Sequence, residues 1–175
     1  LLEQRTDVGA GRAVRYGAVI TGYLRHLKRT PATAPLLRGM AMVLSDNVDH
    51  GQLRTLAHVA GGQIGAALPL SSCTTIEDFE AAINAQLLSM DWGWVRLEVA
   101  KDHVSIVVGD NPLTTLLGAS SSDWAPAILE GLFAEWLRDM GATQELDVRQ
   151  VLADELPDNL MKFRLAHVNS FSEQL

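Results

Sequence analysis

The chain contains one cysteine among its 175 residues, so it cannot form an internal disulfide. A single cysteine, Cys73, in a turn-like run suits a reducing cytosol. It has no catalytic signature around it, so nothing marks it as a nucleophile. No stretch reaches the roughly 18 consecutive apolar residues that a membrane helix requires. Residues 1–11 also lack a basic region followed by an apolar one, so we expect no secretory signal. These absences predict a soluble cytoplasmic protein without membrane insertion.

Recognisable catalytic and metal motifs are missing as well. The five histidines show no spacing to cysteine, carboxylate or one another that would fix a metal; they are His26, His50, His58, His103 and His167. No nucleophile elbow or phosphate-binding loop is present. Gly61, Gly62 and Gly65 follow no predicted strand, so a close helix crossing or a tight turn explains them better than a cofactor loop. The sequence therefore predicts no catalytic residue, no metal and no cofactor.

Positive charge is scarce outside the first thirty residues. Residues 1–30 carry six basic and two acidic side chains, whereas the rest of the chain carries eight basic and nineteen acidic ones. An acidic body repels the phosphate backbone, which argues against nucleic-acid binding. The basic segment could contact an anionic partner, a membrane surface or the acidic body of a neighbouring copy, but an ordinary solvated helix face is the simpler interpretation.

The length suits a single domain with its own hydrophobic core. The hydrophobic fraction of 47% and the charged fraction of 20% are ordinary for a globular protein. We expect residues 1–30 to form a basic, partly helical N-terminal extension and residues 31–170 to form one domain.

Hydrophobic periodicity predicts an α+β fold. Several N-terminal helices should pack on a small antiparallel sheet, with one long helix between its hairpins. Helices are expected at residues 11–28, 33–44, 49–67, 76–90 and 123–140, and strands at 93–99, 103–108, 145–151 and 159–168. Apolar side chains recur at helical spacing in the second and third helices; they are Leu36, Leu37, Met40, Val43 and Leu44, then Leu53, Leu56, Val59, Ala60 and Ile64.

Residues of particular types mark the helix ends. Thr74 or Thr75 should cap the fourth helix, whose first turn is acidic as the helix dipole favours. Pro126 suits the first turn of the last helix, with Ser122 or Asp123 as its cap. We expect a loop at residues 109–122.

All four tryptophans lie within residues 89–99 and 123–137. Trp92 and Trp94 are two apart and should share one face of a strand, open to a sugar or to another copy of the chain. Trp124 and Trp136 belong to a helix whose apolar stripe predicts a core; with them we assign Leu129 and Phe133 to the structural core.

Four carboxylates near the tryptophans admit a glycosidase alternative: Asp91, Glu98, Glu130 and Glu135. Such an enzyme needs two inward carboxyls at a defined separation. Glu98 lies opposite the apolar strand face, and Glu130 and Glu135 fall beside the helix stripe. Solvent exposure is therefore the favoured interpretation.

Two blocks strongly resemble the BcsD family of bacterial cellulose synthase proteins: residues 87–98 (LLSMDWGWVRLE) and residues 124–136 (WAPAILEGLFAEW). Shorter matches extend the resemblance over residues 35–167. The first thirty residues look like an extension beyond the family pattern.

The resemblance implies a non-enzymatic cytoplasmic accessory of cellulose export near the inner membrane, built from dimers assembled into a cylindrical octamer. Its expected partners are the cellulose synthase complex, nascent β-1,4-glucan chains and a proline-rich protein. Glucan contacts are expected from Arg12, Arg15, Tyr16 and Tyr23, and from Trp92 and Trp94. Two alternatives remain open: an adaptor or cytoskeletal scaffold that positions the synthase without touching glucan, and the glycosidase.

Overall fold

The structure is a computed structural model that describes residues 33–151, 157 and 159–174. The helix expected at 11–28 lies outside the described residues, as do Arg12, Arg15, Tyr16 and Tyr23. The described residues fall within one compact unit, Ala32–Leu175, and the fold is that of this unit.

The sheet has four strands in the order β1, β2, β4, β3, and every neighbouring pair is antiparallel. The elements follow the chain in the order α2 (Ala34–Asn47), α3 (His50–Ala67), α4 (Ile76–Ser89), β1 (Trp94–Val99), β2 (Val104–Gly109), α5 (Leu113–Leu117), the 3₁₀ helix η1 (Ala119–Ser121), α6 (Pro126–Asp139), β3 (Leu146–Val151), β4 (Leu160–His167) and the 3₁₀ helix η2 (Val168–Gln174). This arrangement confirms the predicted α+β fold, including the long helix between two hairpins.

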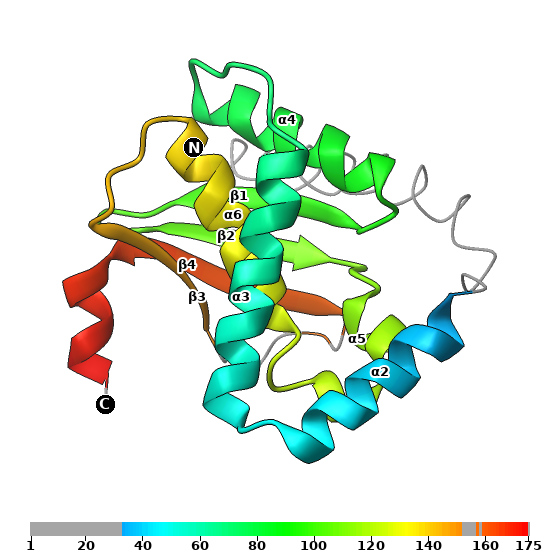
Figure 1. Cartoon of the computed structure of the whole chain (residues 1–175). Helices are drawn as coiled ribbons and strands as arrows, with labels where there is room; N and C mark the ends of the chain where they lie inside the picture. Colours follow the sequence, from blue (N-terminus) through cyan, green and yellow to red (C-terminus); the bar gives the residue numbers. More distant parts are fainter. Residues whose placement is uncertain (1–32, 152–156, 158, 175) are drawn as a thin grey trace, which may run out of the picture. The chain divides into compact units, whose positions relative to one another are not determined.

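Helices cover one face of the sheet in two layers. Figure 1 shows α6 lying over the strands and α3 crossing in front of α6. The α3 and α6 backbones touch where two glycines meet: a Cβ atom on Gly61 would lie 1.9 Å from the Ile128 carbonyl oxygen, and one on Gly131 would lie 1.9 Å from that of His58. This contact confirms the helix-crossing interpretation for Gly61, and Gly65, where a Cβ atom would lie 2.8 Å from that of Glu135, fits it too; at Gly62 a Cβ atom would have room.

The α3 stripe expected from periodicity is only partly correct: Leu53 is buried and Ile64 packs against the core, but Leu56, Val59 and Ala60 are exposed. The buried residues of α3 are Leu53, Ala57, Gly61 and Gly65, which recur every fourth position, whereas Leu56 and Val59 are exposed. Small side chains face α6 because the backbones approach too closely for larger ones. The larger Leu56 and Val59 therefore point away from α6.

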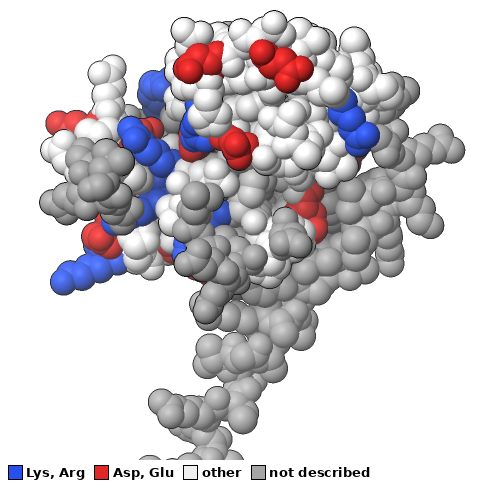
Figure 2. Space-filling view, turned by 90° about the horizontal axis from the view of Figure 1, so that it is seen from below, with Lys and Arg blue, Asp and Glu red and all other residues white. Residues whose placement is uncertain are grey.

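Helix α2 also presents its large apolar residues to the outside. Its buried side chains are Ala34 and Ala41, whereas Leu36, Met40 and Val43 are exposed. An apolar stripe ordinarily marks the buried face of a helix. Figure 2, which views the molecule from the side where α2 lies in Figure 1, shows a broad uncharged area with charged side chains around it.

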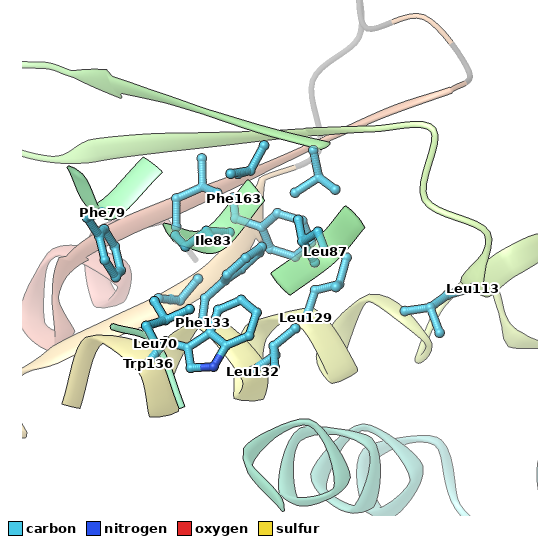
Figure 3. Close-up of a cluster of buried hydrophobic side chains, with 14 residues drawn as sticks. Leu70, Phe79, Ile83, Leu87, Leu113, Leu129, Leu132, Phe133, Trp136 and Phe163 are labelled. Carbon is cyan, nitrogen blue, oxygen red and sulfur yellow. The ribbon is translucent and has the colours of Figure 1, made fainter. Parts of the chain in front are cut away.

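The main core lies between α4, α6 and the sheet, as Figure 3 shows. Phe133 packs edge-on against Phe163, with ring centroids 5.8 Å apart, and contacts Trp136 at 6.2 Å. The Trp136 indole is fully buried, and its Nε1 donates to the Leu68 carbonyl oxygen over 2.8 Å. Leu129 is buried in the same cluster.

A second, smaller cluster joins α2 to the chain around the start of α6. Trp124 is buried there with Ala41, Leu53 and Ala57. Its Nε1 donates to the Ser45 hydroxyl oxygen over 3.1 Å. Trp124 therefore anchors the inner face of α2.

The start of α6 differs from the prediction. Its N-cap is Ala125, which makes no side-chain hydrogen bond, so the expected cap at Ser122 or Asp123 is wrong. The chain enters α6 through tight turns in which the Ala125 N–H donates to the Ser121 carbonyl oxygen over 2.7 Å. The loop expected at 109–122 likewise contains α5 and η1, which are too short for a periodic pattern to reveal.

The capping box of α4 leads to a pH prediction. The Thr75 hydroxyl accepts from the Asp78 N–H, and the Asp78 carboxylate accepts from the Thr75 N–H. The pKa of Asp78 lies below its ordinary value because the hydroxyl of Thr75, and after it that of Thr74, favours the ionised form. Its stabilising contribution is therefore present above the unfolded value of about pH 4 and is lost as the pH falls below it.

We expect an Asp78→Asn variant to be less stable than the parent chain at pH 7 and to approach it at pH 3. Urea unfolding midpoints of both proteins at the two pH values measure this difference. An equal difference at both pH values would contradict the assignment.

Candidate functional site

The indole of Trp94 is held against the backbone of β2. Trp94 pairs across the hairpin with Gly109, where a Cβ atom would lie 2.2 Å from the indole ring. Its Nε1 donates to Oδ2 of Asp110 over 3.0 Å, and the other oxygen of that carboxylate accepts from Asn159. Only 8% of Trp94 is exposed, so within one chain the ring offers little surface for stacking a sugar.

Trp92 and Trp94 do not share a face of the sheet. β1 begins at Trp94, and Gly93 before it has a φ of +89°, so the alternation rule does not extend back to Trp92. Trp94 lies on the opposite face from Val95, whereas the half-buried Trp92 packs against the core cluster that contains Val95. The prediction of a paired tryptophan platform is wrong because a left-handed glycine separates the two residues.

No aromatic side chain in the described ranges is exposed. Phe171 is half-buried, and the Arg149 guanidinium lies 5.2 Å from its ring centroid. The four residues assigned to the core, Trp124, Leu129, Phe133 and Trp136, are buried. The aromatic side chains of this part are therefore buried or half-buried.

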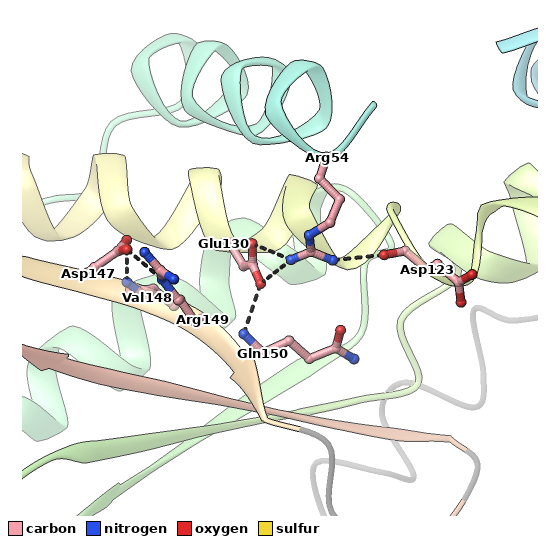
Figure 4. A network of polar contacts seen from close by, with 7 residues as sticks. All are labelled: Arg54, Asp123, Glu130, Asp147, Val148, Arg149 and Gln150. Carbon is pink, nitrogen blue, oxygen red and sulfur yellow. Dashed lines mark hydrogen bonds and ion pairs between the residues drawn. The ribbon is translucent and has the colours of Figure 1, made fainter. Parts of the chain in front are cut away.

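Glu130 is buried at the centre of a polar network between α3, α6 and β3 (Figure 4). Its carboxylate accepts from Nη2 of Arg54 at 2.8 and 2.9 Å and from the Gln150 N–H at 2.9 Å. Arg54 also donates to the Asp123 carbonyl oxygen over 2.8 Å. The expectation that Glu130 is exposed is wrong. Its charge is compensated by an arginine 76 positions away in the sequence, a pairing that helix periodicity cannot reveal.

The same carboxylate closes one edge of the sheet. β3 is an edge strand, and the N–H groups of Val148 and Gln150 are bonded by the carboxylates of Asp147 and Glu130. Open strand edges ordinarily recruit further strands. Here the donors of the edge are already occupied.

At the opposite edge of the sheet, side chains of α4 form hydrogen bonds with the backbone of β1. The Asn84 amide accepts from the Val95 N–H over 2.8 Å and donates to the Val95 carbonyl oxygen over 2.9 Å. Oε2 of Glu80 accepts from the Leu97 N–H over 2.7 Å. Side chains from helices therefore occupy polar groups on both edges of the sheet.

Two adjoining hollows, of about 420 and 300 Å³, share His58, Asp147 and Val148 in their linings. None of the described residues that line them is a phenylalanine, tyrosine or tryptophan. Asp147 is paired with Arg149 at 2.9 Å, and Glu135 forms an ion pair with Arg138 beside the larger hollow. These two ion pairs lie within β3 and within α6, whereas the contacts of Glu130 join α3, α6 and β3.

The remaining candidate carboxylates lie apart from this network. Glu98 is exposed on β1, as expected, and Asp91 lies in the turn after α4 with a φ of +55°. Within residues 33–151 and 159–174, no three histidine, cysteine, aspartate or glutamate side chains could hold a metal ion. No helix of this part is both long and apolar enough to cross a bilayer.

The sequence model of the family that comprises the D subunit of cellulose synthase matches residues 19–163. This chain belongs to that family. The match begins before residue 31, so the view that the first thirty residues lie outside the family pattern is wrong for residues 19–30. The family pattern therefore extends into the basic N-terminal segment.

Curated relatives from the BcsD family share one operon name. A "Cellulose synthase operon protein D" of Komagataeibacter xylinus is 33% identical over 84 residues, which are 47% of this chain and 53% of the relative. A second protein of that name and species is 26% identical over 112 residues, which are 63% and 72% of the two chains. One from Komagataeibacter sucrofermentans is 31% identical over 84 residues, again 47% and 53%. Two of these matches thus span about half the length of the relative.

Proposed function

We propose that this chain is a non-enzymatic accessory protein of bacterial cellulose biosynthesis. It acts as an oligomeric scaffold that guides nascent β-1,4-glucan chains and aids their ordered export and crystallisation, close to the cytoplasmic side of the inner membrane. Membership of the BcsD family, matched over residues 19–163, carries the proposal. The synthase complex is its principal partner, and a proline-rich protein is a further one.

The contacts of Glu130 support a structural role for its carboxylate. Its two oxygens bind Arg54 and the backbone of β3, so the group holds the fold together. An acid catalyst of glycoside hydrolysis must instead present its carboxyl to the leaving oxygen across a cleft.

The glucan contacts of this proposal lie in the N-terminal segment. Arg12, Arg15, Tyr16 and Tyr23 combine donors for sugar hydroxyls with rings that can stack on a pyranose. Trp92 and Trp94 are secondary candidates because both are at least half-buried. A guide requires such groups to be repeated around a passage, which an oligomer supplies.

A strain that lacks the native protein and carries variants of it tests this role. We expect a chain without residues 1–30 to remain folded and oligomeric, and we expect the strain to secrete cellulose of reduced yield and crystallinity, measured by dry mass and X-ray diffraction. A Tyr16→Ala, Tyr23→Ala double variant should reproduce much of the defect, with Leu88→Glu as a surface control. Unchanged fibre order in the deletion strain would refute the assignment.

The absence of an exposed aromatic side chain from the described part favours a second candidate. In this alternative the chain is an adaptor or cytoskeletal scaffold that positions synthase complexes and never contacts glucan. Titration of the full chain with soluble cello-oligosaccharides, followed by amide chemical shifts and tryptophan fluorescence, distinguishes the two. A saturable response supports the guide, and no response up to millimolar sugar supports the adaptor.

A further inference from the structure

Helix α2 has apolar residues on both its inner and its outer face, as expected of a helix that packs against neighbours on two sides. Its inner face is made of small residues, Ala34 and Ala41, which contact the body of the protomer. Its outer stripe consists of larger apolar residues: Leu36 is 65% exposed, Met40 55% and Val43 63%. A surface helix of a single protomer has the reverse distribution.

A glycine lies in the middle of the same outer stripe. Gly39 is separated from Leu36 and Val43 by three and four positions, so the three share one helix face. A glycine inside a helix costs about 0.5–1 kcal/mol relative to alanine. Nothing in the described protomer accounts for it, because a Cβ atom at Gly39 would meet no atom within 4 Å. At Gly61 and Gly131, by contrast, the crossing of α3 and α6 explains the missing side chain.

Exposed apolar residues are concentrated on α2 and the helix that follows it. Of the eleven large apolar side chains exposed in the described part of the chain, five lie on α2 and two on α3; the seven are Leu36, Met40, Met42, Val43, Leu44, Leu56 and Val59. Each of the seven exposes between 38% and 65% of its surface. These two helices therefore carry most of the exposed large apolar side chains of the described part, which favours an apolar partner such as a second copy of the chain.

We propose that the outer face of α2, centred on Gly39, packs against the same face of a second copy of this chain. The stripe of Leu36, Gly39, Met40 and Val43 has no charged member, so it can meet itself about a two-fold axis without opposing like charges. Gly39 allows the two helix backbones to approach closely at the centre of the contact. On the two edge strands, the N–H groups of Val95, Leu97, Val148 and Gln150 are already bonded by side chains, which disfavours an interface made by strand pairing there.

This inference rests on the proposed oligomeric scaffold and names one of its contacts. The test compares the mass of the full chain with that of three variants by light scattering after size-exclusion chromatography, over a hundredfold range of concentration. Val43→Glu places a charge in the stripe, and Gly39→Leu adds apolar bulk without charge. Leu88→Glu is the matched control, because Leu88 is 52% exposed on α4, away from the stripe.

We expect the parent chain and Leu88→Glu to form the same oligomer. Val43→Glu and Gly39→Leu should each at least halve its mass, with circular dichroism spectra close to that of the parent and a melting temperature lowered by the loss of the interface. Gly39→Leu is the sharper variant: added apolar surface strengthens nonspecific association but blocks a close backbone contact.

An oligomer of unchanged mass in Val43→Glu and Gly39→Leu would overturn the α2 contact and leave the scaffold proposal standing. A parent chain that is monomeric at every concentration would overturn both. A loss of mass in Leu88→Glu equal to that in Val43→Glu would also overturn the assignment to α2, because the effect would not be specific to that face.

Discussion

The Gly61→Ala variant is expected to lose about 3 kcal/mol of unfolding free energy, at the upper end of the cost of overpacking. The new Cβ atom would lie 1.9 Å from the Ile128 carbonyl oxygen and 2.9 Å from the Leu132 nitrogen. Both atoms belong to the α6 backbone, so the helices must separate to admit it. Urea unfolding followed by circular dichroism measures the loss.

The neighbouring glycine provides a matched control. A Cβ atom on Gly62 would meet its nearest atoms at 3.9 Å, which is ordinary van der Waals contact. Gly62→Ala should therefore gain about 0.5–1 kcal/mol from its better helix propensity. Equal stabilities for the two alanine variants would show that the α3 and α6 backbones are not in contact at Gly61.

Replacing Trp136 by alanine should cost about 3–5 kcal/mol of unfolding free energy. The indole is fully buried, packs on Phe133 and is hydrogen-bonded to Leu68, so its removal leaves a cavity and an unpaired carbonyl oxygen. Thermal and urea unfolding of the purified variant test this expectation. A Trp136→Ala chain as stable as the parent would contradict the burial of the side chain.

Trp136→Phe separates the two contributions. It retains an aromatic ring beside Phe133 but loses the indole N–H that bonds Leu68, so its cost should be about 1–3 kcal/mol. A phenylalanine variant as unstable as the alanine variant would mean that the hydrogen bond dominates over packing.

The sequence predicted the strands and the α4 cap well because these depend on local patterns. Val95 and Leu97 alternate with Arg96 and Glu98, and the period of two is visible within six residues. The Thr75 capping box spans only three positions. The α6 core was predictable for the same reason, since its stripe repeats every three to four residues.

The faces of α2 and α3 could not be predicted, because hydrophobicity alone does not say which side a helix buries. In α3, contact with α6 selects Ala57, Gly61 and Gly65, which carry little hydrophobic signal, over Leu56 and Val59. The decisive quantity is the distance between two backbones. That distance depends on Gly131, 70 positions away from Gly61, and no local pattern reports it.

The candidate site shows the same limit. The burial of Glu130 follows from its pairing with Arg54 and with the backbone of β3. The separation of Trp92 from Trp94 follows from the left-handed conformation of Gly93. One of these causes lies far away in the sequence, and the other requires a backbone angle that the residue type permits but does not dictate.

The bonds that close the sheet edges have a consequence for synthesis on the ribosome. Asn84 and Glu80 precede the β1 residues that they bond by 11 and 17 positions, and Glu130 precedes Gln150 by 20. Chains emerge from the N-terminus onward. In both hairpins the helix that supplies these side chains is therefore synthesised before the edge strand. The side chains are already present when the backbone of the edge strand leaves the ribosomal exit tunnel. Nascent chains crowded on one messenger are thereby given a local alternative to pairing with one another.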